Sequence, residues 1–306
     1  MGKLFFLVLT FCISNDLWAA PDVYQVGRQD GSSITLYVSP PPGVATYGVT
    51  LMVQGSGCAS AFQNAVAMGA IVFPDGTATA RLDVEKYGIQ KDATTCPAAF
   101  LEHNTVTERI QDHLIVLNWL RRQSWWNHKL FIVGGSEGGI ESASLAVLIP
   151  ETVKAGLMSS PLGSTMAKSW LNVNEHQLQK EGKTPHEIRN ALQRIQKQFQ
   201  IMRENPTWKK SWQGLTNTYK WWADILDYQT AQLLLQTDVP IIFFQGDNDQ
   251  ESDVNCAREL VTKFSASGKN NLTYIERPGE DHTFTDGQGK SHLLEVFQNI
   301  LTFFGK

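Results

Sequence analysis

Short apolar runs rich in β-branched residues alternate along the chain with segments whose apolar positions recur every three or four residues. The short runs predict strands at 34–38, 49–53, 80–84, 130–133, 153–158, 240–244 and 271–276. The helical spacing predicts a helix opened by a capping box at Thr105 and Glu108, and others that end at Pro150, span 256–264 and span 291–304. This alternation is typical of an α/β fold, with a mostly parallel central sheet flanked by helices.

The alternation of strands and helices stops between residues 163 and 238, where the sequence is polar and rich in tryptophan. Thr184, Pro185 and Glu187 combine an N-cap, a proline at the first helical position and a capping glutamate. Apolar residues follow at helical spacing until Asn205 and Pro206, where the helix must end. We therefore expect a helical cap insertion at 163–238, within a core formed by 20–162 and 239–306.

The first twenty residues have the order of a secretory signal. Lys3 precedes an apolar run at 4–13, a polar break at 14–16 follows, and Ala19 and Ala20 come next. We place the cleavage after Ala19, so that residues 1–19 form a signal peptide and the mature protein is secreted or periplasmic. The alternative is a buried first strand. Cys12 lacks the small residue that a lipid-attachment site needs before it, so we expect no stable membrane anchor.

Composition narrows the function classes. The chain has 306 residues, 42% of them apolar, and 26 basic against 30 acidic groups give a net charge of −4. This balance excludes a basic nucleic-acid-binding protein and a highly charged disordered chain. No internal run approaches the roughly eighteen apolar residues of a transmembrane helix.

Three of the four cysteines follow the predicted signal peptide: Cys58, Cys96 and Cys256. An exported protein meets oxidising conditions, so one disulfide and one free thiol are expected. Cys58 and Cys96 both lie in predicted loops, whereas Cys256 begins a predicted helix, so we favour the pair Cys58–Cys96 over three free thiols. No C-x-x-C or Cys/His cluster indicates a metal site, and we expect no cofactor.

The segment Gly-Gly-Ser-Glu-Gly at 134–138 follows the strand at 130–133 directly and precedes a helix. It fits G-x-S-x-G, in which a sharp turn carries the serine to the end of the sheet and the glycines permit close backbone approach. The helix N-terminus favours the negative charge that develops during acyl transfer. Ser136 is therefore the predicted nucleophile, and the alternative is a simple helix-capping turn.

A serine nucleophile needs a base, and the base needs an acid that orients it. Asp249 and His282 each follow a predicted parallel strand, so both belong at the same end of the sheet as the serine. Asp247 competes with Asp249 as the acid, and Asp253 is a third candidate. The six other histidines fall on helices or polar turns, where we expect surface roles. Alternating acids at 247–253 suggest a calcium loop, but the required glycine is absent and Arg258 occupies the position of the final carboxylate.

Acyl transfer also requires hydrogen-bond donors for the oxyanion. The segment Gln-Gly-Ser-Gly-Cys at 54–58 follows the strand at 49–53, and its glycines leave backbone N–H groups available. The N–H groups of Ser56 and Glu137 are the predicted pair, the second because it follows the nucleophile. The alternative is a plain turn held by Cys58.

Together, the Gly-rich loop, the G-x-S-x-G turn, the helical insertion and the late histidine resemble the serine hydrolases of the α/β-hydrolase superfamily. The resemblance spans about residues 22–306 and puts the insertion where the family has its lid. It implies a catalytic triad of Ser136, Asp249 and His282, with the acid three residues after Gly246. Gln54 departs from the histidine that many relatives carry before the oxyanion glycine.

We therefore expect an exported serine hydrolase that cleaves an ester, thioester or amide through an acyl-enzyme, with a carboxylic ester favoured. An acyltransferase and a non-catalytic binding protein are the alternatives. The insertion holds five of the nine tryptophans: Trp170, Trp208, Trp212, Trp221 and Trp222. Acidic residues surround the expected mouth: Glu137, Asp247, Asp249, Glu251, Asp253, Glu280 and Asp281. These sets predict a neutral or cationic, medium-sized small-molecule substrate with a bulky or aromatic acyl or alcohol group, unless the tryptophans only pack the insertion onto the core.

Overall fold

The computed structural model describes residues 20–91 and 95–306, and the predicted signal peptide lies outside the described residues. The strands are β1 (Asp22–Gly27), β2 (Ser33–Ser39), β3 (Tyr47–Val53), β4 (Ile71–Val72), β5 (Ala78–Val84), β6 (Trp126–Gly135), β7 (Thr152–Met158), β8 (Ile241–Gly246) and β9 (Leu272–Arg277). The helices are α1 (Ala61–Met68), α2 (Ala98–His103), α3 (Val106–Leu120), α4 (Glu137–Leu148), α5 (Met166–Lys180), α6 (Pro185–Glu204), α7 (Tyr219–Ile225), α8 (Thr230–Leu234), α9 (Val254–Ala266) and α10 (Leu293–Phe304).

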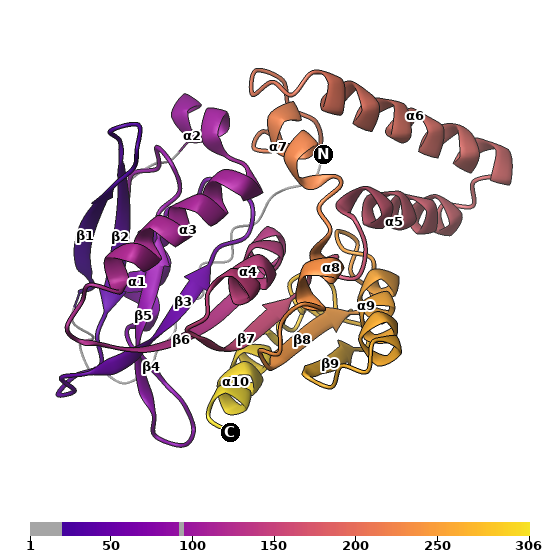
Figure 1. Ribbon diagram of the computed structural model, residues 1–306. Coiled ribbons are helices and arrows are strands. Elements are labelled where there is room, and N and C mark those ends of the chain that lie inside the picture. Colours follow the sequence, from indigo (N-terminus) through magenta and orange to yellow (C-terminus); the bar gives the residue numbers. More distant parts are fainter. Residues whose placement is uncertain (1–19, 92–94) are drawn as a thin grey trace.

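The strands form one sheet in the order β1-β2-β5-β3-β6-β7-β8-β9, with β4 paired to β5 (Figure 1). β1, β2 and β4 pair antiparallel to their neighbours, and the strands from β5 to β9 in this order pair in parallel. The predicted mostly parallel α/β sheet is therefore confirmed. Parallel pairing brings the C-terminal ends of β3, β6, β8 and β9 to one edge, where ligands of such sheets bind.

Side chains of the central strand β6 alternate between two cores. Leu130 and Ile132 pack into the large core on the face covered by α3, α4 and α9. Phe131 and Val133 pack on the opposite face, against α10. The sheet is therefore buried on both faces, which explains why the predicted strand at 130–133 is a continuous apolar run rather than an alternating one.

Two helix starts test the capping predictions. At α6, Thr184 and Glu187 exchange both hydrogen bonds of a capping box, and the helix ends at Glu204, so this prediction is confirmed. At α3, Thr105 accepts a hydrogen bond from the Glu108 amide, but the Glu108 carboxylate pairs with His103 and Lys220 instead. The second capping box is therefore only half formed.

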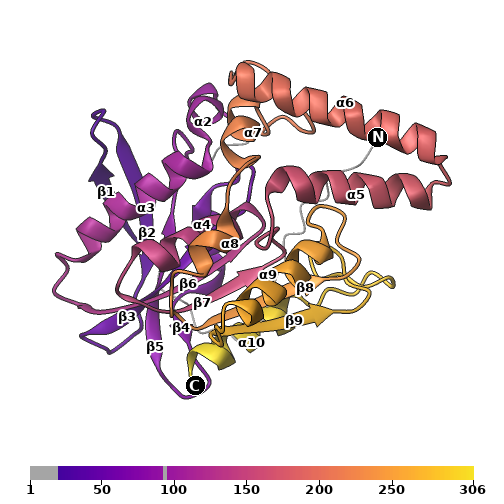
Figure 2. The ribbon, with the colours of Figure 1, turned by 45° about the vertical axis from the view of Figure 1, so that its right-hand side comes forward.

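Helices α5 to α8 lie between β7 and β8 in the sequence, and α5 and α6 lie side by side in both views (Figure 1, Figure 2). Phe199 of α6 and Trp222 of α7 are buried in the large core, which attaches this segment to the sheet. Across residues 20–91 and 95–306, no helix has the length and apolar character needed to cross a membrane.

Candidate active site

Ser136 lies in a tight turn between β6 and α4. Its φ of 57° is in the left-handed region, which residues other than glycine rarely adopt. A Cβ on Gly138 would overlap the carbonyl of Gln54, and a Cβ on Gly134 would overlap the carbonyl of Gly138. The two glycines of the motif therefore allow α4 to start directly against the ends of β3 and β6.

Asp249 and His282 meet at the C-terminal edge of the sheet. His282 Nδ1 lies 2.9 and 3.0 Å from the two carboxylate oxygens of Asp249, whose side chain is fully buried. Asp249 Oδ1 accepts hydrogen bonds from the amides of Glu251 (2.8 Å) and Ser252 (2.9 Å), and Oδ2 accepts one from Gln245 Nε2 (2.8 Å). These donors fix the orientation of the carboxylate that holds the imidazole.

The two competing acids have other partners. Asp247 Oδ1 accepts a hydrogen bond from the Gly279 amide at 2.6 Å, and Asp253 is the N-cap of α9. Of the three candidate acids, Asp249 is the one whose carboxylate contacts His282. Sequence spacing alone left this choice open.

The pKa of His282 is raised above the ordinary value of 6.5. Burial opposes protonation of the imidazole, but the hydrogen bond and charge of Asp249, with further contributions from Glu251 and Asp281, outweigh it. The Glu251 carboxylate lies 3.6 Å from His282 Nε2. The site therefore favours an imidazolium, the form that a general base reaches when it takes up a proton.

Ser136 and His282 line the same small cavity of about 60 Å³, together with Ser56 and Glu137. A Cβ on Gly55 would lie only 3.4 Å from the Ser136 Cβ, so the loop at 54–58 passes directly beside the nucleophile. The predicted nucleophile, base and oxyanion donors are thus brought together, with Asp249 behind His282.

The loop at 54–58 ends at a disulfide. Cys58 and Cys96 are bonded, with Cα atoms 5.4 Å apart, and Cys256 is a buried free thiol, as predicted. Burial, first of all, raises the pKa of Cys256 to about 11, which makes this thiol unreactive.

A buried charged cluster, which the sequence did not predict, lies beneath the tight turn at Ser136. Arg109 Nη1 lies 3.0 Å from the carboxylates of both Glu137 and Glu141. Lys86 is also buried, and burial with the nearby Arg109 lowers its pKa to about 7. His113, which was expected at the surface, is buried, and this burial lowers its pKa to about 4. Its Nδ1–H donates to the Arg109 carbonyl at 2.7 Å.

No family model matches the chain, and no curated protein matches it. Several solved structures do match the chain. Est1E from Butyrivibrio proteoclasticus aligns at 12% identity with a TM-score of 0.57, over 92% of this chain and 97% of Est1E. An acylaminoacyl peptidase from Pyrococcus horikoshii aligns at 11% identity with a TM-score of 0.60, over 94% of this chain and 41% of the peptidase. A puromycin-hydrolyzing peptidase from Mycobacterium tuberculosis aligns at 14% identity with a TM-score of 0.56, over 95% and 38%.

The mostly parallel order of the strands and the alignments with solved structures indicate the same fold. The chain has an α/β-hydrolase fold. It spans nearly all of Est1E but about two fifths of the two peptidases. At these identities the likeness establishes the fold of the chain and not its substrate.

Fewer exposed acidic side chains surround the cavity than the sequence predicts. Glu137 is buried against Arg109, and Glu280 is buried against Arg277. Of the seven acids, Glu137 and Glu251 line the cavity, and the side chain of Glu251 is 67% exposed. A lysine also lies near these acids, because Lys86 is buried under the loop at 54–58 and donates to the Gly55 carbonyl. Of the two acids that line the cavity, Glu251 is therefore the exposed one, and the charges of Asp249 and Asp281 also act on His282.

Four of the tryptophans in residues 163–238 lie at the cavity or next to it. Trp170, Trp221 and Trp222 line the cavity, whereas Trp212 packs against Trp222 with ring centroids 5.1 Å apart. Trp221 Nε1 donates a 2.6 Å hydrogen bond to Glu137 Oε2, and Trp222 Nε1 donates to the Trp212 carbonyl. Trp221 and Trp222 thus pack in the large core and also line the cavity. Core packing is therefore present, and contact of these indoles with a substrate stays a prediction.

Proposed function

We propose that this protein is an exported serine hydrolase that cleaves an ester, thioester or amide bond, with a carboxylic ester favoured. The observation that carries the proposal is the shared cavity: Ser136 at a strained elbow faces the same space as His282, and Asp249 orients that imidazole. The fold supports it, since two of the similar structures are named as peptidases. The disulfide agrees with export into an oxidising compartment.

In the proposed reaction, Ser136 Oγ attacks the carbonyl carbon while His282 Nε2 takes the hydroxyl proton. Asp249 stabilises the imidazolium, and the amides of Ser56 and Glu137 donate to the oxyanion. The imidazolium then protonates the leaving group as the acyl-enzyme forms. Water attacks the acyl-enzyme with His282 again as base, which releases the acid and restores the serine.

Ser136→Ala tests the proposal directly. We expect kcat to fall by about 10⁴- to 10⁶-fold with an unchanged fold, because one member of a triad is lost. A fluorophosphonate probe should label the wild type and leave this variant unlabelled. Ser144→Ala is the matched control, since this hydroxyl lies on α4, the helix that follows Ser136, and bonds to Tyr228 rather than lining the cavity. Labelling that survives Ser136→Ala, or residual activity within tenfold of wild type, contradicts the assignment.

We propose further that residues 163–238 form a cap over the nucleophile and set the size of the substrate. The cavity of about 60 Å³ is far below the roughly 300–1,000 Å³ of sites that hold drug-sized ligands, so a bulky group enters only if a side chain moves. Trp170 is the candidate, because it is half-buried and its buried Nε1 has no partner among the described residues. Trp170→Ala should raise kcat/KM for bulky acyl esters relative to acetyl esters, and an unchanged ratio would rule out this role.

Glu251 is the proposed source of a preference for neutral or cationic substrates over anionic ones. Its exposed carboxylate lies at the cavity beside His282, and a carboxylate attracts cations and repels anions. Glu251→Gln should reduce the ratio of kcat/KM between matched cationic and anionic esters at low salt. Faster turnover of the anionic esters by the wild type would overturn the proposed preference.

A further inference from the structure

Two buried cations bind the carbonyl groups of the loop at 54–58. Lys86 Nζ donates to the carbonyl oxygens of Gly55 (2.7 Å) and Gly57. Arg109 Nη2 donates to the carbonyl of Gln54 at 2.8 Å, and its Nη1 lies 3.4 Å from that of Gly55. Both side chains are over nine-tenths buried, so these contacts are shielded from solvent.

A carbonyl that is held fixes the direction of the next amide. In a planar trans peptide, the C=O of one residue and the N–H of the next point in opposite directions. The Gly55 carbonyl points to Lys86 and Arg109, so the Ser56 N–H must point away from both cations. Ser56 lines the cavity that Ser136, Glu137 and His282 also line.

We infer that Lys86 and Arg109 are positioning residues that turn the Ser56 amide toward the oxyanion. This inference rests on the proposed hydrolase function. Neither cation lines the cavity at Ser136, so they act through the peptide that they hold rather than on the substrate.

Arg109 also connects the two predicted oxyanion donors. Its Nη1 forms an ion pair at 3.0 Å with Glu137 Oε1, and Glu137 carries the second donor amide. One guanidinium thereby contacts the residue after the nucleophile and the peptide before Ser56. Because an oxyanion donor must lie within a few tenths of an ångström of its best position, a rigid link between the two donors affects the transition state more than substrate binding.

A purely structural role is the competing explanation, since removing one member of a buried charged cluster also destabilises a protein. The two roles differ in kinetics. Loss of positioning lowers kcat at nearly constant KM, whereas a structural loss lowers the melting temperature and leaves the kcat of the folded fraction unchanged.

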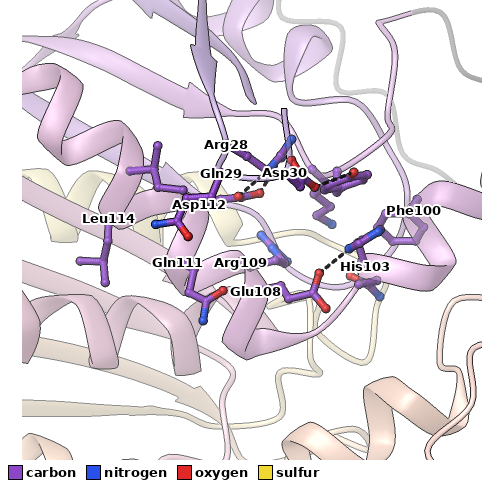
Figure 3. Close-up of a pocket in the computed structure, with 14 residues that line it drawn as sticks. Arg28, Gln29, Asp30, Phe100, His103, Glu108, Arg109, Gln111, Asp112 and Leu114 are labelled. Carbon is purple, nitrogen blue, oxygen red and sulfur yellow. Dashed lines mark hydrogen bonds and ion pairs between the residues drawn. The ribbon is translucent and has the colours of Figure 1, made fainter. Parts of the chain in front are cut away.

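Figure 3 shows Arg109 on the wall of a second, larger cavity, which Lys86 also lines and which has a volume of about 680 Å³. This cavity gives room for the longer side chain of Lys86→Arg.

The experiment compares Lys86→Met, Lys86→Arg and Lys154→Met in the full chain with one neutral ester. Lys154 is the matched control, because its Nζ also donates to two backbone carbonyls, those of Phe303 and Phe304, at the end of α10. We expect Lys86→Met to lower kcat about 10²-fold with KM within about threefold, and to raise the Ki of a trifluoromethyl ketone by the same factor as kcat falls. Lys86→Arg should recover at least tenfold, and Lys154→Met should keep the wild-type kcat.

Wild-type kcat in folded Lys86→Met, an equal loss in Lys154→Met, or no recovery in Lys86→Arg would overturn the inference. If Lys86→Met does not fold, Arg109→Lys replaces it, because a lysine cannot bridge Gln54 and Glu137, and kcat should then fall at least tenfold. Ser136→Ala in the same assay separates this inference from the proposed function. An active Ser136→Ala refutes the hydrolase mechanism, whereas an inactive one beside an unaffected Lys86→Met refutes only the positioning role.

Discussion

Asp249→Asn separates the orientation of the imidazole from all other properties of the site. Oδ1 of Asp249 accepts two backbone amides, from Glu251 and Ser252, so the oxygen of the new amide will stay there. Its NH₂ group must then replace Oδ2, which faces Gln245 Nε2 at 2.8 Å and His282 Nδ1 at 2.9 Å. Gln245 can rotate its side-chain amide, because its own Oε1 has no partner among the described residues. The rotation takes Nε2 away from the carbonyls of Gly246 and Ser252, each at 3.3 Å.

The substitution also changes the tautomer of His282. Facing an NH₂ group, Nδ1 must become the acceptor, which moves the ring proton to Nε2. An imidazole in that tautomer cannot take the proton of Ser136. The same change in a serine protease triad lowers kcat by about 10⁴-fold, which corresponds to about 5.4 kcal/mol of transition-state stabilisation. The two backbone hydrogen bonds to Oδ1 remain, whereas the rotated Gln245 gives up its contacts with two carbonyls. We therefore expect the free energy of unfolding to fall by about 1–3 kcal/mol.

The assay is steady-state hydrolysis of one neutral ester, together with urea unfolding of each variant. Asp247→Asn is the matched control, since the Asp247 oxygen accepts the Gly279 amide and an amide oxygen does the same. We expect its kcat within about threefold of wild type. If Asp247→Asn is the more damaging change, or if Asp249→Asn keeps kcat within tenfold, the assignment of the acid is wrong.

Three further predictions follow from the geometry. On the acid side of its pH profile, kcat/KM should rise with an apparent pKa above 6.5. The reason is that His282 must be neutral to act as a base, whereas its neighbours favour the charged form. An apparent pKa below 6.5 contradicts this. Reducing the Cys58–Cys96 disulfide, whose cysteines are 38 residues apart, should lower the free energy of unfolding by up to about 4 kcal/mol in urea. A peptide map that joins Cys96 to Cys256 would disprove this pairing. Gly138→Ala should lower the free energy of unfolding by about 1–3 kcal/mol and reduce activity, since its Cβ would overlap the Gln54 carbonyl. A melting temperature equal to that of the wild type would count against close packing at the turn of Ser136.

Local patterns predicted the parts of the fold that depend on neighbouring residues. The helix that starts after Thr184, the turn at Ser136 and the strands of the sheet interior all have short-range signals, and the structure contains each of them. The strand β1 was missed because it lies at the edge of the sheet and most of its side chains are exposed, which leaves no apolar run to detect. Helix α1 was also missed, although Ser60 caps it, because it is only eight residues long.

Contacts between distant segments could not be read from the sequence. Lys86 lies in the loop after β5, Arg109 lies on α3 and Glu137 begins α4. Each is a charged residue of a type that is usually exposed. The same holds for His113, whose burial follows from the packing of α3 against the sheet and not from its own neighbours. The choice between Asp247 and Asp249 likewise depends on which carboxylate the loop after β8 turns toward His282.

The hydrogen bond from Trp221 to Glu137 has a consequence for protein engineering. Glu137 Oε1 is paired within the core by Arg109, but Oε2 takes its donor from the inserted segment. Exchange of residues 163–238 for a shorter or foreign segment would remove the indole and leave a buried carboxylate oxygen without its donor, right after the nucleophile. The segment is therefore not an interchangeable module. A grafted replacement has to supply a hydrogen-bond donor at the position of Trp221, or the chain has to carry a compensating change at Glu137.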